Sequence, residues 1–188
     1  WMNGMDIITV ALSLWFIFPA FVANAIPVLI GGGTPIDLGR KLPDGHRLFG
    51  DGKTVRGLWG GLMAGTLTGI FQAFISNWVI DNLRSTVVLS AISVETLRYV
   101  PFRAFLISLG ALLGDLLGSF IKRSIGLRRG APAPLLDQLS FLLGAFTLVS
   151  FSFPFQVEYA IILVILTPLI HLAANMMSYL MGLKKVPW

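Results

Sequence analysis

The chain has 188 residues, of which 55% are hydrophobic and 12% charged; soluble domains carry about 25% charged residues, so this composition excludes a water-soluble fold of this size. The chain contains no cysteine, which excludes disulfides, zinc–thiolate sites and a cysteine nucleophile. The formal net charge of +5 is typical of a membrane protein that contacts anionic lipids or anionic substrates, and nucleic acid is not an expected partner because no basic domain stands outside the apolar segments.

Five apolar segments approach or exceed the roughly 20 residues that cross a bilayer. In chain order they are residues 7–30, 58–80, 101–121, 139–157 and 159–183. The intervening residues 85–100 are semi-apolar but include Glu95 and Arg98, which favours a connector at the membrane interface. The sequence therefore predicts an all-α polytopic membrane protein, with one integral membrane domain and five transmembrane helices.

The distribution of lysine and arginine predicts the orientation. Of 14 basic residues, five lie between the first two spans, four between the third and fourth, and two after the fifth. By the positive-inside rule this side is cytoplasmic, so the N-terminus is outside and the C-terminus is cytoplasmic. We therefore expect a multi-pass protein of the cell membrane with two functional loops, residues 31–57 and 122–137, facing the cytoplasm.

The first of these loops contains the run Gly50-Asp51-Gly52-Lys53-Thr54. It is not a P-loop, because Arg47 stands where the first glycine is required and no βα unit surrounds it. Lys53 nevertheless supplies a positive charge, and Thr54 leads into the second span, whose N-terminus favours phosphate oxygens. A basic loop that faces anionic lipid is the alternative interpretation.

Glycines recur every four residues in the second span, from Gly57 to Gly69, and in the third, from Gly110 to Gly118. This spacing predicts close helix packing, because lipid provides no hydrophobic drive between helices. At the outer end of the third span, Arg103 is expected to extend its charge to the membrane interface.

Asp115 lies in the third span, where a carboxylate is energetically costly and marks a functional site. It shares a helix face with Ser119 and Lys122, at spacings of four and three residues. Asp137 begins a similar polar face at the fourth span. The structural alternatives are a salt bridge from Asp115 to Lys122 and an N-cap role for Asp137.

The fifth span carries a polar stripe formed by His171, Asn175 and Ser178. Hydrogen bonds between helices are one explanation, and a lining for the site or for a lipid headgroup cleft is the other. Asn24, which precedes Pro27 in the first span, is interpreted as marking a kink. Taken with the basic loops, the two membrane-surface carboxylates suggest Mg²⁺-assisted chemistry on a phosphate.

Two runs of residues resemble a known family. The run from Gly114 to Arg123, followed by Asp137-Gln138-Leu139, resembles the signature of membrane CTP-dependent cytidylyltransferases, and residues 52–57 resemble their Lys-Thr-x-Glu-Gly element. The triplet Pro35-Ile36-Asp37 is similar to the archaeal branch, the CDP-archaeol synthases. Two positions depart from the family pattern: Ser140 replaces a second aspartate, and Arg56 replaces a glutamate.

The resemblance implies a nucleotidyltransferase that joins CTP to an isoprenoid glycerol phosphate, giving CDP-archaeol and pyrophosphate with Mg²⁺ as cofactor. It implies catalytic roles for Asp115, Asp137 and Lys122, with both aspartates as metal ligands. The residues expected to bind substrate are Asp37, Lys53, Thr54, Arg56, Ser119, Arg123, Arg128, Arg129 and Gln138. Another membrane phospholipid-synthesis transferase, or a non-catalytic transporter or assembly subunit, is the alternative, and a homo-oligomer stays open.

Overall fold

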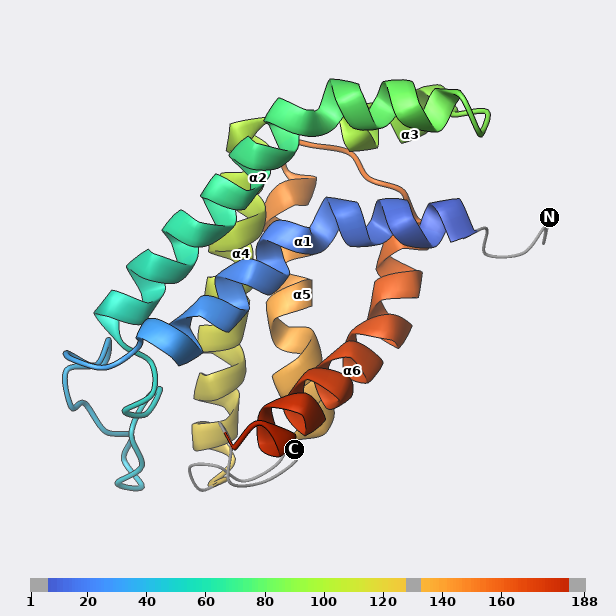
Figure 1. Ribbon diagram of the computed structural model, residues 1–188. Coiled ribbons are helices and arrows are strands. Elements are labelled where there is room, and N and C mark those ends of the chain that lie inside the picture. The colour runs from blue at the N-terminus through green and yellow to red at the C-terminus, as the bar shows by residue number, and fades with distance from the viewer. Residues whose placement is uncertain (1–6, 128–132, 183–188) are drawn as a thin grey trace.

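The computed structural model describes residues 7–127 and 133–182. Six helices occur in these residues: α1 (Ile7–Ile30), α2 (Val55–Arg84), α3 (Ala91–Leu97), α4 (Pro101–Ser124), α5 (Pro134–Ser150) and α6 (Val157–Leu180). The β-structure in the same residues is confined to two isolated bridges within the first loop. The predicted all-α fold is thus confirmed for the described part of the chain (Figure 1).

Four of these helices are long and apolar enough to cross a membrane: α1, α2, α4 and the Val157–Met177 part of α6. The predicted fourth span, residues 139–157, differs from the structure. It is the shorter helix α5, which begins earlier because Pro134 suits the first turn of a helix, and ends at Ser150. Its 17 residues rise roughly 25 Å, less than the roughly 30 Å hydrocarbon core. The count of five full-length spans is therefore not confirmed.

The core lies where α1, α4 and α5 meet the start of α6. Its fully buried side chains include Phe16, Ile107, Phe141, Leu142, Tyr159 and Leu163. In contrast, α2 carries bulky apolar side chains on its outer surface, and Trp59, Phe74 and Trp78 are 60%, 86% and 69% exposed. Apolar exposure of this extent on a long helix suits contact with lipid.

The glycine ridges lie at the helix contacts, as the spacing predicts. A Cβ atom added at Gly61 of α2 would lie 2.5 Å from the carbonyl oxygen of Ala23 in α1. One added at Gly114 of α4 would lie 3.0 Å from the Cα atom of Gly144 in α5. Because these distances leave no room for a side chain, the glycines set how closely α2 approaches α1 and how closely α4 approaches α5.

The connector between α2 and α4 folds back onto the bundle. The sequence predicts that Arg103 extends its charge to the membrane interface, but the structure buries it: only 4% of the residue is exposed. Its guanidinium donates hydrogen bonds to the carbonyl oxygens of Thr96 (2.9 Å) and Arg98 (3.0 Å), and it lies 4.1 Å from the centroid of the Tyr99 ring. Arg103 therefore secures the connector rather than serving as an interfacial anchor.

Candidate functional site

The first loop is organised around the carboxylate of Asp37, a residue that is 4% exposed. Asp37 forms an ion pair with Arg47 and accepts backbone hydrogen bonds from Phe49 (3.1 Å) and Gly50 (3.2 Å). The Arg47 guanidinium holds the pKa of the Asp37 carboxyl well below its usual range. Gly50 has a positive φ of 93°, which a side chain at this turn would strain.

The closed loop presents Lys53 and Thr54 at the beginning of α2. The backbone of Ile36 donates to the carbonyl oxygen of Lys53 (2.9 Å), and Pro35 and Thr54 form a bridge. Thr54 is the N-cap of α2, and its hydroxyl oxygen accepts a hydrogen bond from the backbone amide of Gly57 (3.1 Å). The positive end of the helix dipole is therefore fixed beside the Lys53 side chain.

A cavity of about 450 Å³ opens at this point between the first loop and the ends of α1, α4, α5 and α6. The lining residues with polar side chains are Asn24, Lys53, Thr54, Asp115, Lys122, Asp137, Gln138, His171 and Asn175. Apolar residues such as Val28, Leu116 and Leu172 complete the wall. A cavity with a few convergent polar groups on an apolar wall is the usual form of a ligand site.

Two ion pairs of lysine with aspartate line this cavity. Lys53 of the loop pairs with Asp115 of α4, and Lys122 of α4 pairs with Asp137 of α5. Asp115 thus pairs with a residue 62 positions away rather than with Lys122 on its own helix. Asp137 is not the N-cap of α5, which is Ala133; its carboxylate accepts the backbone amide of Ala133 at 3.3 Å.

The structure brings together six of the predicted site residues. Lys53, Thr54, Asp115, Lys122, Asp137 and Gln138 all line the cavity. Two carboxylates and two ammonium groups around one cavity provide ligands for a cation and partners for phosphate oxygens.

Four other predicted site residues lie outside the lining. Asp37 organises the loop, Arg56 is exposed on the first turn of α2, and Ser119 is only 4% exposed within α4. Arg123 is 8% exposed and donates to the carbonyl oxygen of Leu127, which closes the C-terminal end of α4. The remaining two, Arg128 and Arg129, lie outside the described residues.

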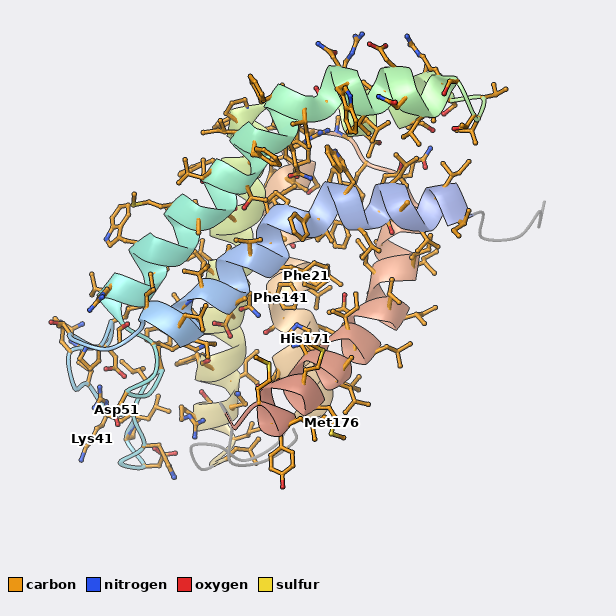
Figure 2. All side chains as sticks on the ribbon, viewed as in Figure 1. Phe21, Lys41, Asp51, Phe141, His171 and Met176 are labelled. Atoms are coloured by element: carbon orange, nitrogen blue, oxygen red, sulfur yellow. The ribbon has the colours of Figure 1, made fainter. Side chains whose placement is uncertain are left out.

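Three further polar residues, His171, Asn175 and Asn24, line the cavity. His171 packs its ring against those of Phe141 and Phe21, at centroid distances of 5.4 and 6.5 Å (Figure 2). Asn175 follows one turn later on α6, and Asn24 joins them from α1. The stripe on α6 was visible in the sequence as a candidate lining. Asn24 was predicted to mark a kink because Pro27 follows it, whereas the structure places it in the cavity lining.

Comparison with known proteins shows the family to which this chain is related. A family model described as CarS-like, CDP-archaeol synthase, matches residues 5–188. CDP-archaeol synthase of Thermococcus gammatolerans is 48% identical over 179 residues, covering 94% of this chain and 95% of its own. The chain belongs to the CDP-archaeol synthase family.

Other members of the CDP-archaeol synthase family agree with this assignment. The enzyme of Methanocaldococcus jannaschii is 43% identical over 176 residues, covering 94% of this chain and 96% of its own. A solved structure of an intramembrane enzyme for archaeal membrane lipid biosynthesis matches with a TM-score of 0.70 and 40% identity, over 86% of this chain and 91% of that one. The helical bundle of this chain therefore has the same fold as that solved enzyme.

Proposed function

We propose that this chain is a CTP-dependent nucleotidyltransferase that converts an isoprenoid glycerol phosphate and CTP to CDP-archaeol (CDP-2,3-digeranylgeranylglycerol) and pyrophosphate. The observation that carries the proposal is the pair of lysine–aspartate contacts, Lys53 with Asp115 and Lys122 with Asp137, around one cavity at the N-terminus of α2. This arrangement supplies cationic partners for a triphosphate and carboxylates for a metal ion, in a family whose members are named for this synthesis.

The lysines and the start of α2 hold the nucleotide. The triphosphate oxygens accept hydrogen bonds from Lys53 and Lys122 and lie near the first amides of α2, where the helix dipole favours negative charge. The second pKa of a phosphate monoester is about 6, so the lipid phosphate is largely dianionic at neutral pH and attacks without a general base. The new bond joins a lipid phosphate oxygen to the α-phosphorus of CTP, and the bond from that phosphorus to the β-phosphate oxygen breaks.

The donor set fits a Mg²⁺ ion that is shared with the nucleotide. Asp115 and Asp137 line the same cavity and already pair with cations, and Mg²⁺ in phosphoryl-transfer sites takes one or two carboxylates plus substrate oxygens. Within residues 7–127 and 133–182, no group of three or more His, Cys, Asp or Glu residues could hold a metal ion. Asp115 and Asp137 would therefore hold the ion together with oxygens of the substrate. When bound, the ion supplies charge neutralisation at the phosphates.

The cavity is proposed to face the cytoplasm, with α5 as a fifth and shorter crossing, the N-terminus outside and the C-terminus inside. Support comes from the shared cavity, because the first loop and the start of α5 must lie at one membrane surface to line it together. Of the ten lysines and arginines in the described residues, seven lie at that end of the bundle, in the first loop, at the start of α2 and at the end of α4. It is also the surface from which a cytoplasmic nucleotide enters.

The direct test measures CTP-dependent pyrophosphate release by the purified protein. An ether-linked isoprenoid glycerol phosphate and an ester-linked acyl glycerol phosphate are compared side by side, each with Mg²⁺ and with excess EDTA. We expect release with the ether lipid, weaker release with the ester lipid, and none with EDTA. Failure to release pyrophosphate with either lipid would favour a non-catalytic membrane subunit.

A further inference from the structure

A second cavity, of about 570 Å³, lies at the end of α2 and the start of α4. Figure 1 shows these helix ends beside α3, away from the first loop that lines the first cavity. Its lining residues come from the end of α2, the α3 connector, the start of α4 and the α5–α6 link: Arg84, Leu89, Ala91, Val94, Glu95, Arg98, Val100, Arg103 and Phe153. The proposed reaction uses none of these residues.

Positive charge dominates this cavity. Three arginines, Arg84, Arg98 and Arg103, face a single carboxylate, Glu95. Arg84 and Arg98 are exposed, so their guanidinium groups can reorient towards a ligand. The N-terminus of the 24-residue helix α4 lies beside them, and its first amides lack intrahelical partners. Both features favour an anion.

Arg103 gives this charge a fixed and buried component. Only 4% of the residue is exposed; its Nη2 donates to the carbonyl oxygens of Thr96 and Arg98, and its Nη1 donates to that of Glu95 (3.4 Å). Its Nε has no hydrogen-bond partner in the described part of the chain and is itself covered by neighbouring atoms, so the guanidinium offers a ligand its positive charge and not this donor. Carbonyl oxygens and the Tyr99 ring hold that charge in the cavity wall, where an anion would compensate it further.

The remaining wall is apolar. Leu89, Val94, Val100 and Phe153 line the cavity, and beside them Val88, Ile92 and Phe102 are exposed by 101%, 51% and 57%. Apolar side chains at the rim of an arginine site match a ligand whose phosphate is attached to hydrocarbon chains. The cavity also lies at the ends of α2 and α4, two helices long and apolar enough to cross the membrane, and lipid headgroups lie where such helices end.

We infer that this cavity binds the phosphate headgroup of an anionic membrane lipid, at the membrane surface opposite the catalytic cavity. The phosphate contacts Arg84, Arg98 and Arg103, and the lipid chains lie along the exposed apolar rim. Because Arg103 also holds the connector carbonyls, a bound lipid stabilises the α2–α4 connector against the bundle.

Native mass spectrometry of the purified full chain tests this inference. The protein is titrated with an anionic phospholipid, with a zwitterionic phospholipid of the same chains, and with inorganic phosphate. The double variant Arg84→Gln and Arg98→Gln removes two exposed charges, so folding is preserved. Lys41→Gln is the matched control, because Lys41 is an exposed basic residue that lines neither cavity.

We expect one anionic lipid to bind the wild type and the control with equal affinity, and the double variant to bind it about tenfold or more weakly, as expected for lost charge-assisted hydrogen bonds. Saturable stabilisation of the wild type against heating should accompany binding and be reduced in the double variant. Equal binding by the double variant, equal binding of the zwitterionic lipid, or binding of inorganic phosphate as tight as that of the lipid would each overturn the inference.

Discussion

The Asp115 carboxylate and the Lys53 ammonium meet across 62 residues of sequence, and their pairing connects the first loop to α4. A carboxylate inside a span costs roughly 2.5–3.5 kcal/mol on insertion scales, so it persists where a cation compensates it. Lys53 is that cation in the structure described here. With Mg²⁺ bound, Asp115 would be one of its ligands, and the Lys53 ammonium would be available to a phosphate oxygen.

Replacing Asp115 with asparagine keeps the size of the side chain and removes its charge. We expect Asp115→Asn to lower the rate of pyrophosphate release by roughly 100-fold or more, the scale of losing an electrostatic group at a reacting centre. Asp81→Asn, the same change at an exposed residue near the far end of α2, is the control and should keep full activity. Near-normal activity of Asp115→Asn across a Mg²⁺ titration would reduce the aspartate to a structural ion-pair partner.

Lys53 is expected to strengthen the binding of CTP. Lys53→Ala removes one charge-assisted contact to the triphosphate, so the KM for CTP should rise about tenfold, with a smaller change for the lipid substrate. Steady-state kinetics with each substrate varied in turn measure both constants. Lys41→Ala, which removes an exposed lysine of the same loop, should leave both unchanged. Unaltered CTP kinetics in Lys53→Ala would remove this residue from the nucleotide site.

Asp37 is predicted to stabilise the first loop in a pH-dependent way. The pKa of its carboxyl is lowered by Arg47 and by the amides of Phe49 and Gly50, so the folded loop favours the charged form. That stabilisation is fully present above the unfolded pKa of about 4 and is lost as the pH falls through the lower folded pKa. Asp37→Asn should therefore speed amide exchange in residues 34–54 at neutral pH.

The difference between Asp37→Asn and the wild type should narrow as the pH is lowered below about 4, because there the Asp37 carboxyl of the opened loop takes up a proton while that of the folded loop stays charged. Asp44→Asn alters another aspartate of the same loop, one that is exposed. It should change exchange across the loop far less. Equal exchange in Asp37→Asn and the wild type at neutral pH would contradict the organising role of Asp37.

At the scale of elements, the contact of α4 with α5 depends on glycine. The pair Gly110 and Gly114 packs against Gly144, with backbone against backbone. This contact brings Asp137 on α5 within reach of Lys122 on α4, so helix packing and site assembly are coupled. α2 depends in the same way on Gly61 for its approach to α1.

Gly114→Ala tests this packing. In an exposed helix interior, replacing glycine with alanine stabilises the helix by about 1 kcal/mol. Here, however, the added methyl group would lie 3.0 Å from the Cα atom of Gly144 and closer still to the backbone of Ser140. We expect overpacking to dominate and to destabilise the protein by about 1–3 kcal/mol, seen as a lower Tm in detergent. Leu117→Ala, on the outer surface of the same helix at 60% exposure, should change Tm little. A raised Tm in Gly114→Ala would show that α4 and α5 can separate at low cost.

For the whole molecule, both basic loops are expected on the cytoplasmic side and the α3 connector on the outer side. The chain has no cysteine, so a thiol reagent can label only the single cysteine that is introduced. In sealed right-side-out vesicles, an impermeant thiol reagent should label Val88→Cys and miss Lys41→Cys and Ser124→Cys until the membrane is permeabilised. Labelling of Lys41→Cys from outside would reverse the proposed orientation.

The sequence by itself determined the apolar segments that become α1, α2, α4 and α6, because about 20 apolar residues have few folded alternatives to a membrane helix. It also determined the glycine faces, since the four-residue period places them on one side of a helix. The local sequence placed Asp115 and Lys122 on one helix face and Lys53 in a basic loop, and the resemblance to a known family singled out these residues together with Asp137.

Only the tertiary structure decided which of these charges meet. Spacing along one helix allowed Asp115 to pair with Lys122, but the loop closed by Asp37 and Arg47 carries Lys53 to Asp115 instead, and Lys122 pairs with Asp137. Arg103 was likewise buried under the connector and not extended to the interface. Local sequence specifies which face of a helix a side chain occupies, whereas its partner depends on how loops close and helices cross, and those are set by contacts between residues distant in the chain.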